Sequence, residues 1–80
     1  MKLPRDLTGH ELARALVRLG YQVTRQAGSH IRLTSYDNGE HHLTIPAHSP
    51  VKIGTLAAIL ADLQAHHHLT REELLQKLFN

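Results

Sequence analysis

Apolar residues recur every three or four positions between Thr8 and Gly20, which is the spacing of one face of a helix. The stretch Thr8-Gly9-His10-Glu11 opens this segment and has the form of a capping box, in which the side chains of Thr8 and Glu11 accept hydrogen bonds from each other's backbone amides. Gly20 suits the left-handed conformation that commonly ends a helix. The pattern therefore predicts an amphipathic helix bounded by Thr8 and Gly20.

Three later segments alternate between apolar and polar residues, and a period of two is typical of strands. We predict strands over residues 21–26, 30–35 and 41–46, with Pro46 ending the third strand or marking it as an edge. The side chains expected to face the core are Tyr21, Val23, Ile31, Leu33, Leu43 and Ile45.

The turn at 37–39 selects how the second and third strands pair. A two-residue loop would place Leu33 opposite Thr44 and mix apolar with polar side chains on each face. A three-residue loop instead pairs Leu33 with Leu43 and puts Gly39 at the left-handed position that such loops require. We therefore predict the three-residue loop.

The same register predicts which histidines lie near His30. It places His30 opposite Pro46, so the chain after Pro46, including His48, is expected to pass close to His30. His42 is expected two same-face steps away from His30, roughly 13 Å at ~3.3 Å per residue, which is too far for a shared metal ion.

The C-terminal part of the chain predicts two further helices. The first covers residues 54–63 and is followed by a connector, 64–69, that carries three consecutive histidines. The second begins at another capping box, Thr70 to Glu73, and ends near Phe79. The order α-β-β-β-α with a short C-terminal helix predicts an α+β fold, in which helices cover one face of a three-stranded antiparallel sheet and the other face is open to water.

Length and composition limit the classes of function. The 80 residues, 41% of them hydrophobic, predict one small domain over residues 1–80 rather than a disordered chain. The chain has no cysteine, which excludes disulfides, thiolate metal sites and cysteine nucleophiles and suits the cytoplasm. No apolar run approaches the ~20 residues that span a bilayer, so no membrane role is expected. The formal net charge is +2, and basic residues gather at Arg14, Arg18, Arg25, Arg32 and Lys52.

His30 is the strongest candidate for a chemical role among the eight histidines. The strand phase places it with Arg32 on the open face of the sheet. Gly28 permits an unusual backbone conformation just before it, and Ser29 offers a hydroxyl beside it.

The start of the helix after Lys52 is a second candidate feature. Gly54 and Thr55 fall in its first turn, and a cation beside free helix amides favours an anion such as phosphate. The sequence has no Gly-rich phosphate loop and no H-E-x-x-H or G-x-S-x-G motif. Its three aromatic residues disfavour binding by stacked bases, whereas an open sheet with basic residues suits recognition of RNA by shape and backbone.

Neither a metal ion nor another cofactor is expected. Structural zinc sites take four ligands in a tetrahedral arrangement, commonly with cysteine, which this chain lacks. His41, His42 and the run His66-His67-His68 are therefore interpreted as solvated surface residues.

Five stretches make the chain resemble the HicA family of bacterial toxins, also called YcfA-like proteins. They follow one another at family-like spacing over nearly the whole chain. The stretches are Thr8-Gly9-His10-Glu11-Leu12, Leu19-Gly20-Tyr21, Arg25-Gln26-Ala27-Gly28-Ser29-His30, Ile45-Pro46-Ala47-His48, and Lys52-Ile53-Gly54-Thr55-Leu56 with Ile59-Leu60. The resemblance implies a fold like that of double-stranded-RNA-binding domains, and an mRNA-cleaving toxin that a HicB antitoxin neutralises. It also implies that His30 is the catalytic residue.

The resulting hypothesis is the toxin of a type II toxin–antitoxin pair, a metal-independent endoribonuclease acting on mRNA. His30 would take the proton of a ribose 2′-hydroxyl, and the freed oxygen would attack the adjacent phosphorus. His48 is the candidate general acid. The residues expected to bind RNA or phosphate are Gly28, Ser29, Arg32, His48, Lys52, Gly54 and Thr55. The expected protein partner is a HicB-like antitoxin, with the chain monomeric alone or hetero-oligomeric with the antitoxin.

Two other functions remain open at this point. One is an RNA-binding module without catalysis, which predicts salt-sensitive RNA binding but no new RNA ends. The other is an interaction protein whose open sheet face mainly docks an antitoxin.

Overall fold

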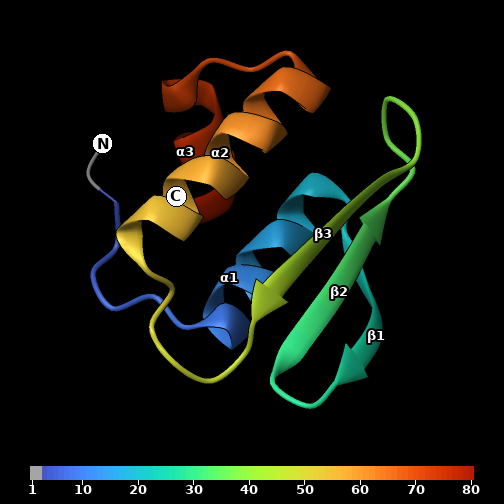
Figure 1. The fold of residues 1–80 in the computed structure, drawn as a ribbon. Coiled ribbons are helices and arrows are strands. Elements are labelled where there is room, and N and C mark those ends of the chain that lie inside the picture. The colour runs from blue at the N-terminus through green and yellow to red at the C-terminus, as the bar shows by residue number, and fades with distance from the viewer. Residues whose placement is uncertain (1–2) are drawn as a thin grey trace.

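The computed structural model describes residues 3–80. An N-terminal helix is followed by a three-stranded antiparallel sheet and two C-terminal helices, which confirms the predicted α+β class (Figure 1). The elements are α1 (Gly9–Leu16), the 3-10 helix η1 (Val17–Leu19), β1 (Gln22–Ala27), β2 (His30–Ser35), β3 (His41–Pro46), α2 (Ile53–His67) and α3 (Arg71–Phe79).

The predicted register of β2 and β3 is confirmed. Leu33 pairs with Leu43, and His30 pairs with Pro46. The last pair of the ladder is Ser35 with His41. Tyr36 and Glu40, which flank the predicted loop at 37–39, are therefore not paired in the ladder. The apolar side chains of β2 and β3 therefore lie on one face of the hairpin, as predicted for the three-residue loop.

The pairing of β1 with β2 contains a bulge at Thr24. Val23 pairs with Leu33 and Arg25 pairs with Arg32, so Thr24 has no partner residue across the ladder. One extra residue reverses the side-chain phase of the rest of the strand. Arg25 therefore lies on the same face as Arg32, opposite to the face that strict alternation from Val23 predicts.

β1 is an edge strand, and this overturns part of the predicted core. All six of its residues are exposed, and Val23 keeps 49% of its surface in solvent although it faces inward opposite Leu33. Figure 1 shows β1 at the side of the sheet farthest from α2 and α3, which leaves Val23 uncovered. Tyr21 is fully buried as predicted, but it lies just before β1, which begins at Gln22.

Both predicted capping boxes are present. The Thr8 hydroxyl accepts from the Glu11 amide at 3.1 Å, and the Glu11 carboxylate accepts from the Thr8 amide at 2.9 Å. Thr70 and Glu73 repeat this arrangement before α3. Hydrogen bonds from Thr8 lower the pKa of Glu11, as expected for a carboxylate that accepts from a backbone amide. Gly20 ends η1 with a left-handed φ of 86°.

α2 is longer than predicted, so the proposed connector at 64–69 was wrong. The helix continues to His67, and His68 ends it in the left-handed conformation with φ 56°. His66 and His67 therefore lie on the last turn of α2, and His67 is buried. The apolar pattern did not predict this last turn, because the buried residues of α2 are apolar only up to Leu63. The next buried residue is His67, which is polar.

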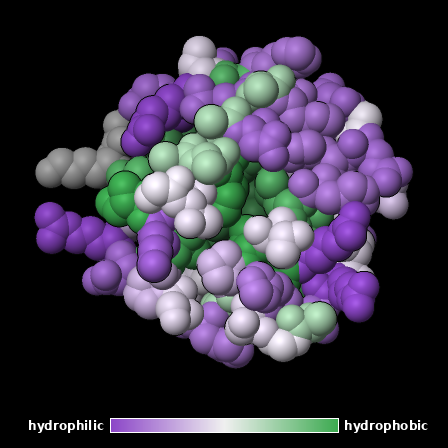
Figure 2. All heavy atoms as spheres, in the orientation of Figure 1, coloured by the Kyte–Doolittle hydropathy of each residue, from purple (hydrophilic) through white to green (hydrophobic). Residues whose placement is uncertain are grey.

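The core lies between the helices and the inner face of the sheet. Figure 2 shows apolar side chains gathered between the helices and β3, with hydrophilic side chains around them. The fully buried larger side chains are Leu12, Leu16, Tyr21, Ile31, Leu33, Ile45, Leu60, Leu63, Leu74 and Leu75. On the other face His30, Arg32, His42 and Thr44 are exposed, so the face predicted to be open is largely open.

Three backbone hydrogen bonds tie the segment after β3 to its surroundings. The Ala47 amide donates to the Ser29 carbonyl at 2.7 Å, and the His10 amide donates to the Ala47 carbonyl at 3.2 Å. The Val51 amide donates to the Leu7 carbonyl at 2.7 Å. The segment is therefore held between the start of α1 and the β1–β2 turn.

No helix in residues 3–80 has the length and apolar character needed to cross a membrane.

Candidate functional site

His30 is positioned by a tight turn between β1 and β2. Gly28 and Ser29 connect the pair Ala27 and His30, and Gly28 has a φ of 58°. A positive φ at only the first of two turn residues is the pattern of a type II′ hairpin, which favours glycine there. A Cβ on Gly28 would meet no atom within 4 Å, so glycine is required by the backbone conformation and not by lack of space.

The central strand holds the backbone of His30 on both sides. His30 pairs with Ala27 on β1 and with Pro46 on β3, at the end of β2. Its side chain is exposed, and within the described part of the chain no hydrogen bond or ion pair engages its ring. The ring nitrogens are therefore available to a ligand on a backbone that is held in place.

Two arginines lie next to His30 on the open face. Arg25 and Arg32 are directly opposite each other on neighbouring strands, and Arg32 is two residues from His30 along β2. Like charges that face each other across strands destabilise a sheet. A pair of this kind is therefore suited to an anion bound between the guanidinium groups. Arg25 was not among the predicted binding residues, because the bulge that turns it outward left no signal in the sequence.

The expected approach of the His48 loop to His30 is confirmed for the backbone. The Ala47 amide donates to the carbonyl of Ser29, one residue before His30. The ring of His48 lies edge-on to that of His10, with 5.4 Å between the ring centres. His10, the second residue of α1, thus joins this end of the sheet, a position that its place in the capping box did not predict.

The N-terminus of α2 carries the other predicted phosphate-binding residues. Lys52 is the N-cap residue and makes no side-chain capping hydrogen bond, and no acidic residue lies in the first turn. Gly54 and Thr55 are exposed there. α1 and α3 differ, because each has a glutamate closing a capping box at its N-terminus. The start of α2 therefore keeps its positive end free, although no hydrogen bond in residues 3–80 links the Lys52 side chain to His30.

His42 is separate from His30, as the register predicted. Its Nδ1 lies 2.8 Å from the Thr34 hydroxyl, which lies 3.0 Å from the hydroxyl of Thr24. Its Nε2 lies 2.6 Å from the carboxylate of Glu40. These bonds cover Thr34, which is buried although it points to the open face. His42 is thus engaged in a polar network at the far end of the strand.

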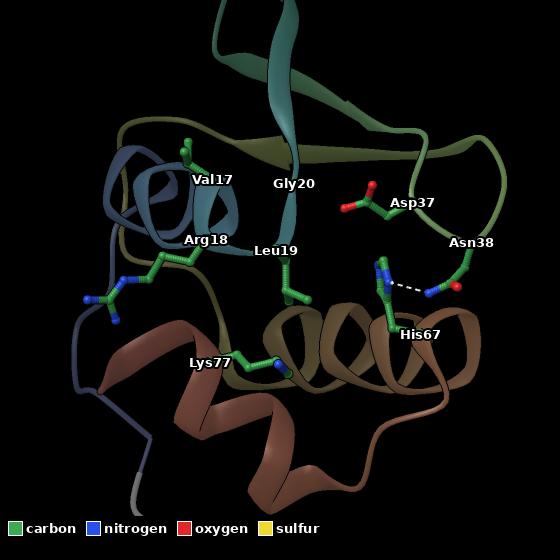
Figure 3. A pocket seen from close by; sticks show the side chains of 8 residues that line it. All are labelled: Val17, Arg18, Leu19, Gly20, Asp37, Asn38, His67 and Lys77. Carbon is green, nitrogen blue, oxygen red and sulfur yellow. Dashed lines mark hydrogen bonds between the residues drawn. The ribbon is translucent and has the colours of Figure 1, made fainter.

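A hollow of about 500 Å³ lies at the opposite end of the sheet from His30. Figure 3 shows His67 directed from α2 toward Asn38 in the β2–β3 turn. The lining residues are Val17, Arg18, Leu19, Gly20, Asp37, Asn38, His67 and Lys77. None of the predicted catalytic or phosphate-binding residues lines this hollow, and His30 lies outside it with an exposed side chain.

Histidines also gather beside this hollow, against the prediction that they are solvated. His41, His66 and His67 each offer a ring nitrogen, and these atoms lie within 4.8 Å of one another. Burial lowers the pKa of His67, as do the neighbouring His66 and His41. Burial also raises the pKa of Tyr21, whose hydroxyl touches two of these rings, to about 12. This cluster is the only group in residues 3–80 with the ligand types and spacing for a metal ion.

Comparison with known families places much of the chain within one family model. The model of a family described as HicA toxin of bacterial toxin–antitoxin matches residues 9–65, which is more than half of the chain. The match spans α1, the sheet and most of α2, and it includes every residue assigned above to the His30 site. Searches of curated proteins and of solved structures found no match.

Proposed function

Because the chain belongs to the HicA toxin family of bacterial toxin–antitoxin systems, we propose that it is an endoribonuclease that cleaves mRNA with His30 as general base. The observation that carries this proposal is the exposed, unengaged imidazole of His30, held at the end of the central strand beside paired arginines. Histidine is the side chain that most often accepts the proton in general base catalysis.

The proposed reaction needs no metal ion. His30 accepts the proton of a ribose 2′-hydroxyl, and the 2′-oxygen forms a bond to the adjacent phosphorus. The bond from phosphorus to the 5′-oxygen breaks, and the leaving oxygen takes a proton, for which His48 is our candidate donor. The support for His48 is the hydrogen bond that holds its neighbour Ala47 to Ser29. One general base contributes roughly 10²–10⁴ in rate, so we expect a slow enzyme.

Positive groups on both sides of His30 are proposed to bind the RNA backbone. Arg25 and Arg32 would hold one phosphate on the sheet. Lys52 and the free amides at Gly54 and Thr55 would hold another and stabilise its developing negative charge. Gly28 and Ser29 would lie against the ribose, since a glycine at the turn leaves open space there.

A toxin of this family implies an antitoxin partner. We propose that the partner is a HicB-like protein, and that the chain is one domain over residues 1–80, monomeric alone and hetero-oligomeric with the antitoxin. The mRNA substrate implies action in the cytoplasm.

RNA cleavage by the purified chain should persist in excess EDTA and should yield ends with a 2′,3′-cyclic phosphate. The physical reason is that the 2′-oxygen itself is the nucleophile. A DNA strand of the same sequence should stay intact, because it lacks this hydroxyl. Analysis of the ends by mass spectrometry checks the result. Cleavage of DNA, or 3′-hydroxyl ends, would contradict the mechanism, and RNA binding without new ends would favour a binding module instead.

Replacing both Arg25 and Arg32 with Gln should weaken RNA binding while leaving the fold at least as stable. Loss of this phosphate contact should reduce the slope of log K against log salt concentration by about 0.7, the value for one neutralised phosphate on a single strand. Removal of the opposed charges should also relieve repulsion within the sheet. Binding of 2′-O-methyl RNA, which resists this cleavage, would be measured by fluorescence anisotropy at several salt concentrations.

The matched control is the double variant Arg14→Gln and Arg71→Gln, which removes the same charge from exposed positions on α1 and α3. It should change the slope much less than the Arg25 and Arg32 variant does. Equal changes in both double variants would mean that only net charge matters, and the assignment of a phosphate site to the sheet would be wrong.

A further inference from the structure

Three imidazoles from two distant parts of the chain meet beside the hollow at the β2–β3 turn. His41 is the first residue of β3, and His66 and His67 are the last two residues of α2. The rings of His41 and His66 stack with their centres 4.3 Å apart, and the His67 ring lies edge-on to His66 at 4.8 Å. The ligand nitrogens of the three lie within 4.8 Å of one another.

Oxygen acceptors orient two of these rings. His41 Nε2 lies 3.1 Å from the carboxylate of Asp62, one helical turn before His66 on α2. His66 Nε2 lies 3.0 Å from the carbonyl of Asp37 and 3.2 Å from that of Gly39. Carbonyl and carboxylate oxygens only accept, so Nε2 of each neutral ring carries the proton and Nδ1 keeps a lone pair. A carboxylate or carbonyl on the far nitrogen is the usual support of a metal-binding histidine.

Tyr21 supplies an oxygen between two rings of the cluster. Its hydroxyl lies 2.6 Å from His41 Nδ1 and 2.8 Å from His67 Nε2, and the side chain is fully buried. The other nitrogen of His67 is 3.5 Å from the side-chain amide of Asn38, which can turn to present its oxygen. The single phenol proton is donated to His41 Nδ1, so His67 Nε2–H donates to the Tyr21 oxygen. With the Asn38 oxygen turned toward it, His67 can carry its proton on Nδ1, and both nitrogens that face Tyr21 present lone pairs once the phenol proton is lost.

The spacing of these atoms is close to that of a tetrahedral site. Bonds of about 2.0–2.1 Å to a tetrahedral ion separate the ligand atoms by roughly 3.4 Å. The nitrogens lie at most 4.8 Å apart, and half-buried His66 at the helix end can move toward the other two. The Tyr21 oxygen, 2.6 and 2.8 Å from two of the nitrogens, must move away from them by about 0.6–0.8 Å. The hollow lined by His67, Asp37 and Asn38 provides a path for the ion.

From this geometry we infer a transition-metal site formed by Nδ1 of His41, Nδ1 of His66 and Nε2 of His67, with the Tyr21 oxygen as fourth donor. The phenol proton leaves to solvent when the ion binds. Imidazole and phenolate donors suit Zn²⁺, Cu²⁺ or Ni²⁺ and not Mg²⁺ or Ca²⁺. The ion would join the start of β3 to the end of α2, at the opposite end of the sheet from His30.

Titration of the purified, tag-free chain with Zn²⁺ by calorimetry tests this site. We expect one ion per chain and a thermal unfolding midpoint that rises by at least ~5 °C at saturating Zn²⁺. His66→Gln and Tyr21→Phe should each weaken Zn²⁺ binding at least ~10-fold, the loss typical when a group that supports a metal is removed. Mg²⁺ should not bind.

Matched controls are His68→Asn, which changes an exposed histidine that ends α2 but lies outside the cluster, and Tyr36→Phe, which changes an exposed tyrosine. Both should bind Zn²⁺ as the unmodified chain does. Unchanged affinity in Tyr21→Phe would overturn the fourth donor. Unchanged affinity in His66→Gln would overturn the site. Loss of binding in His48→Gln would also overturn it, because the ion would then belong to the His10–His48 pair.

A readout without substitutions keeps the test valid if a variant fails to fold. Imidazole ¹⁵N resonances of the unmodified chain should show the largest changes with Zn²⁺ at His41, His66 and His67. Changes confined to other histidines would overturn the proposal.

Discussion

His30→Ala should lower the single-turnover rate of RNA cleavage by about 10²–10⁴-fold, because it removes the proposed general base. The substitution should leave the unfolding midpoint nearly unchanged, because the side chain is exposed and makes no hydrogen bond within residues 3–80. Binding of 2′-O-methyl RNA and of the antitoxin should also persist. Rates measured with a short fluorescent RNA, beside thermal melts of the same protein, check both statements.

His42→Gln is the matched control for this variant. His42 is another exposed histidine on the same face, but it is bonded to Thr34 and Glu40. Its replacement should retain most of the cleavage rate. An unchanged cleavage rate in His30→Ala would contradict the assignment of His30 as the general base. An equal loss of cleavage rate in His30→Ala and His42→Gln would indicate a general effect on the sheet. In cells, expression of the unmodified chain should arrest growth and expression of His30→Ala should not.

Gly9→Ala should destabilise the fold by about 3 kcal/mol or more, which is the upper range for forcing extra volume into a packed interior. A Cβ at Gly9 would lie 1.6 Å from the carbonyl oxygen of Pro46 and 2.8 Å from Cα of Ala47. Both neighbours are backbone atoms that the hydrogen bonds of Ala47 to Ser29 and His10 hold in place, so they cannot move aside cheaply. Thermal unfolding should show a fall of about 10–20 °C in the midpoint.

Gly54→Ala is the matched control, since both glycines lie in the first turn of a helix. A Cβ at Gly54 meets no atom within 4 Å. Alanine there should stabilise the fold slightly, because it removes the extra conformational freedom of glycine in the unfolded chain. A Gly9→Ala protein as stable as Gly54→Ala would contradict the close contact between α1 and the segment after β3.

Local rules predicted the parts of the fold that depend on neighbours in the sequence. The capping boxes at Thr8 and Thr70 involve residues three positions apart, so their geometry follows from the helix itself. The register of β2 and β3 follows from the turn and from keeping Leu33 and Leu43 on one face. The family model agrees with the resemblance that these motifs indicated.

The errors occurred where a distant element decides the environment of a residue. The alternation of apolar and polar residues placed Val23 on the inward face of its strand, yet no helix covers it at the sheet edge. His66 and His67 are polar by type, and the prediction ended α2 before them. Packing against Tyr21 and His41 extends the helix over them, because hydrogen bonds from a buried hydroxyl compensate the burial of imidazole.

The sequence by itself determined the order of the elements, the inward face of the β2–β3 hairpin and the exposure of His30 on the opposite face, because periodicity, caps and turn residues act locally. Only the tertiary structure decided that Arg25 stands beside Arg32, that Gly9 touches the backbone after β3, and that the rings of His41, His66 and His67 lie together. A bulge, a close backbone contact and a cluster each depend on how segments far apart in the chain pack together. No spacing along the sequence encodes that arrangement directly.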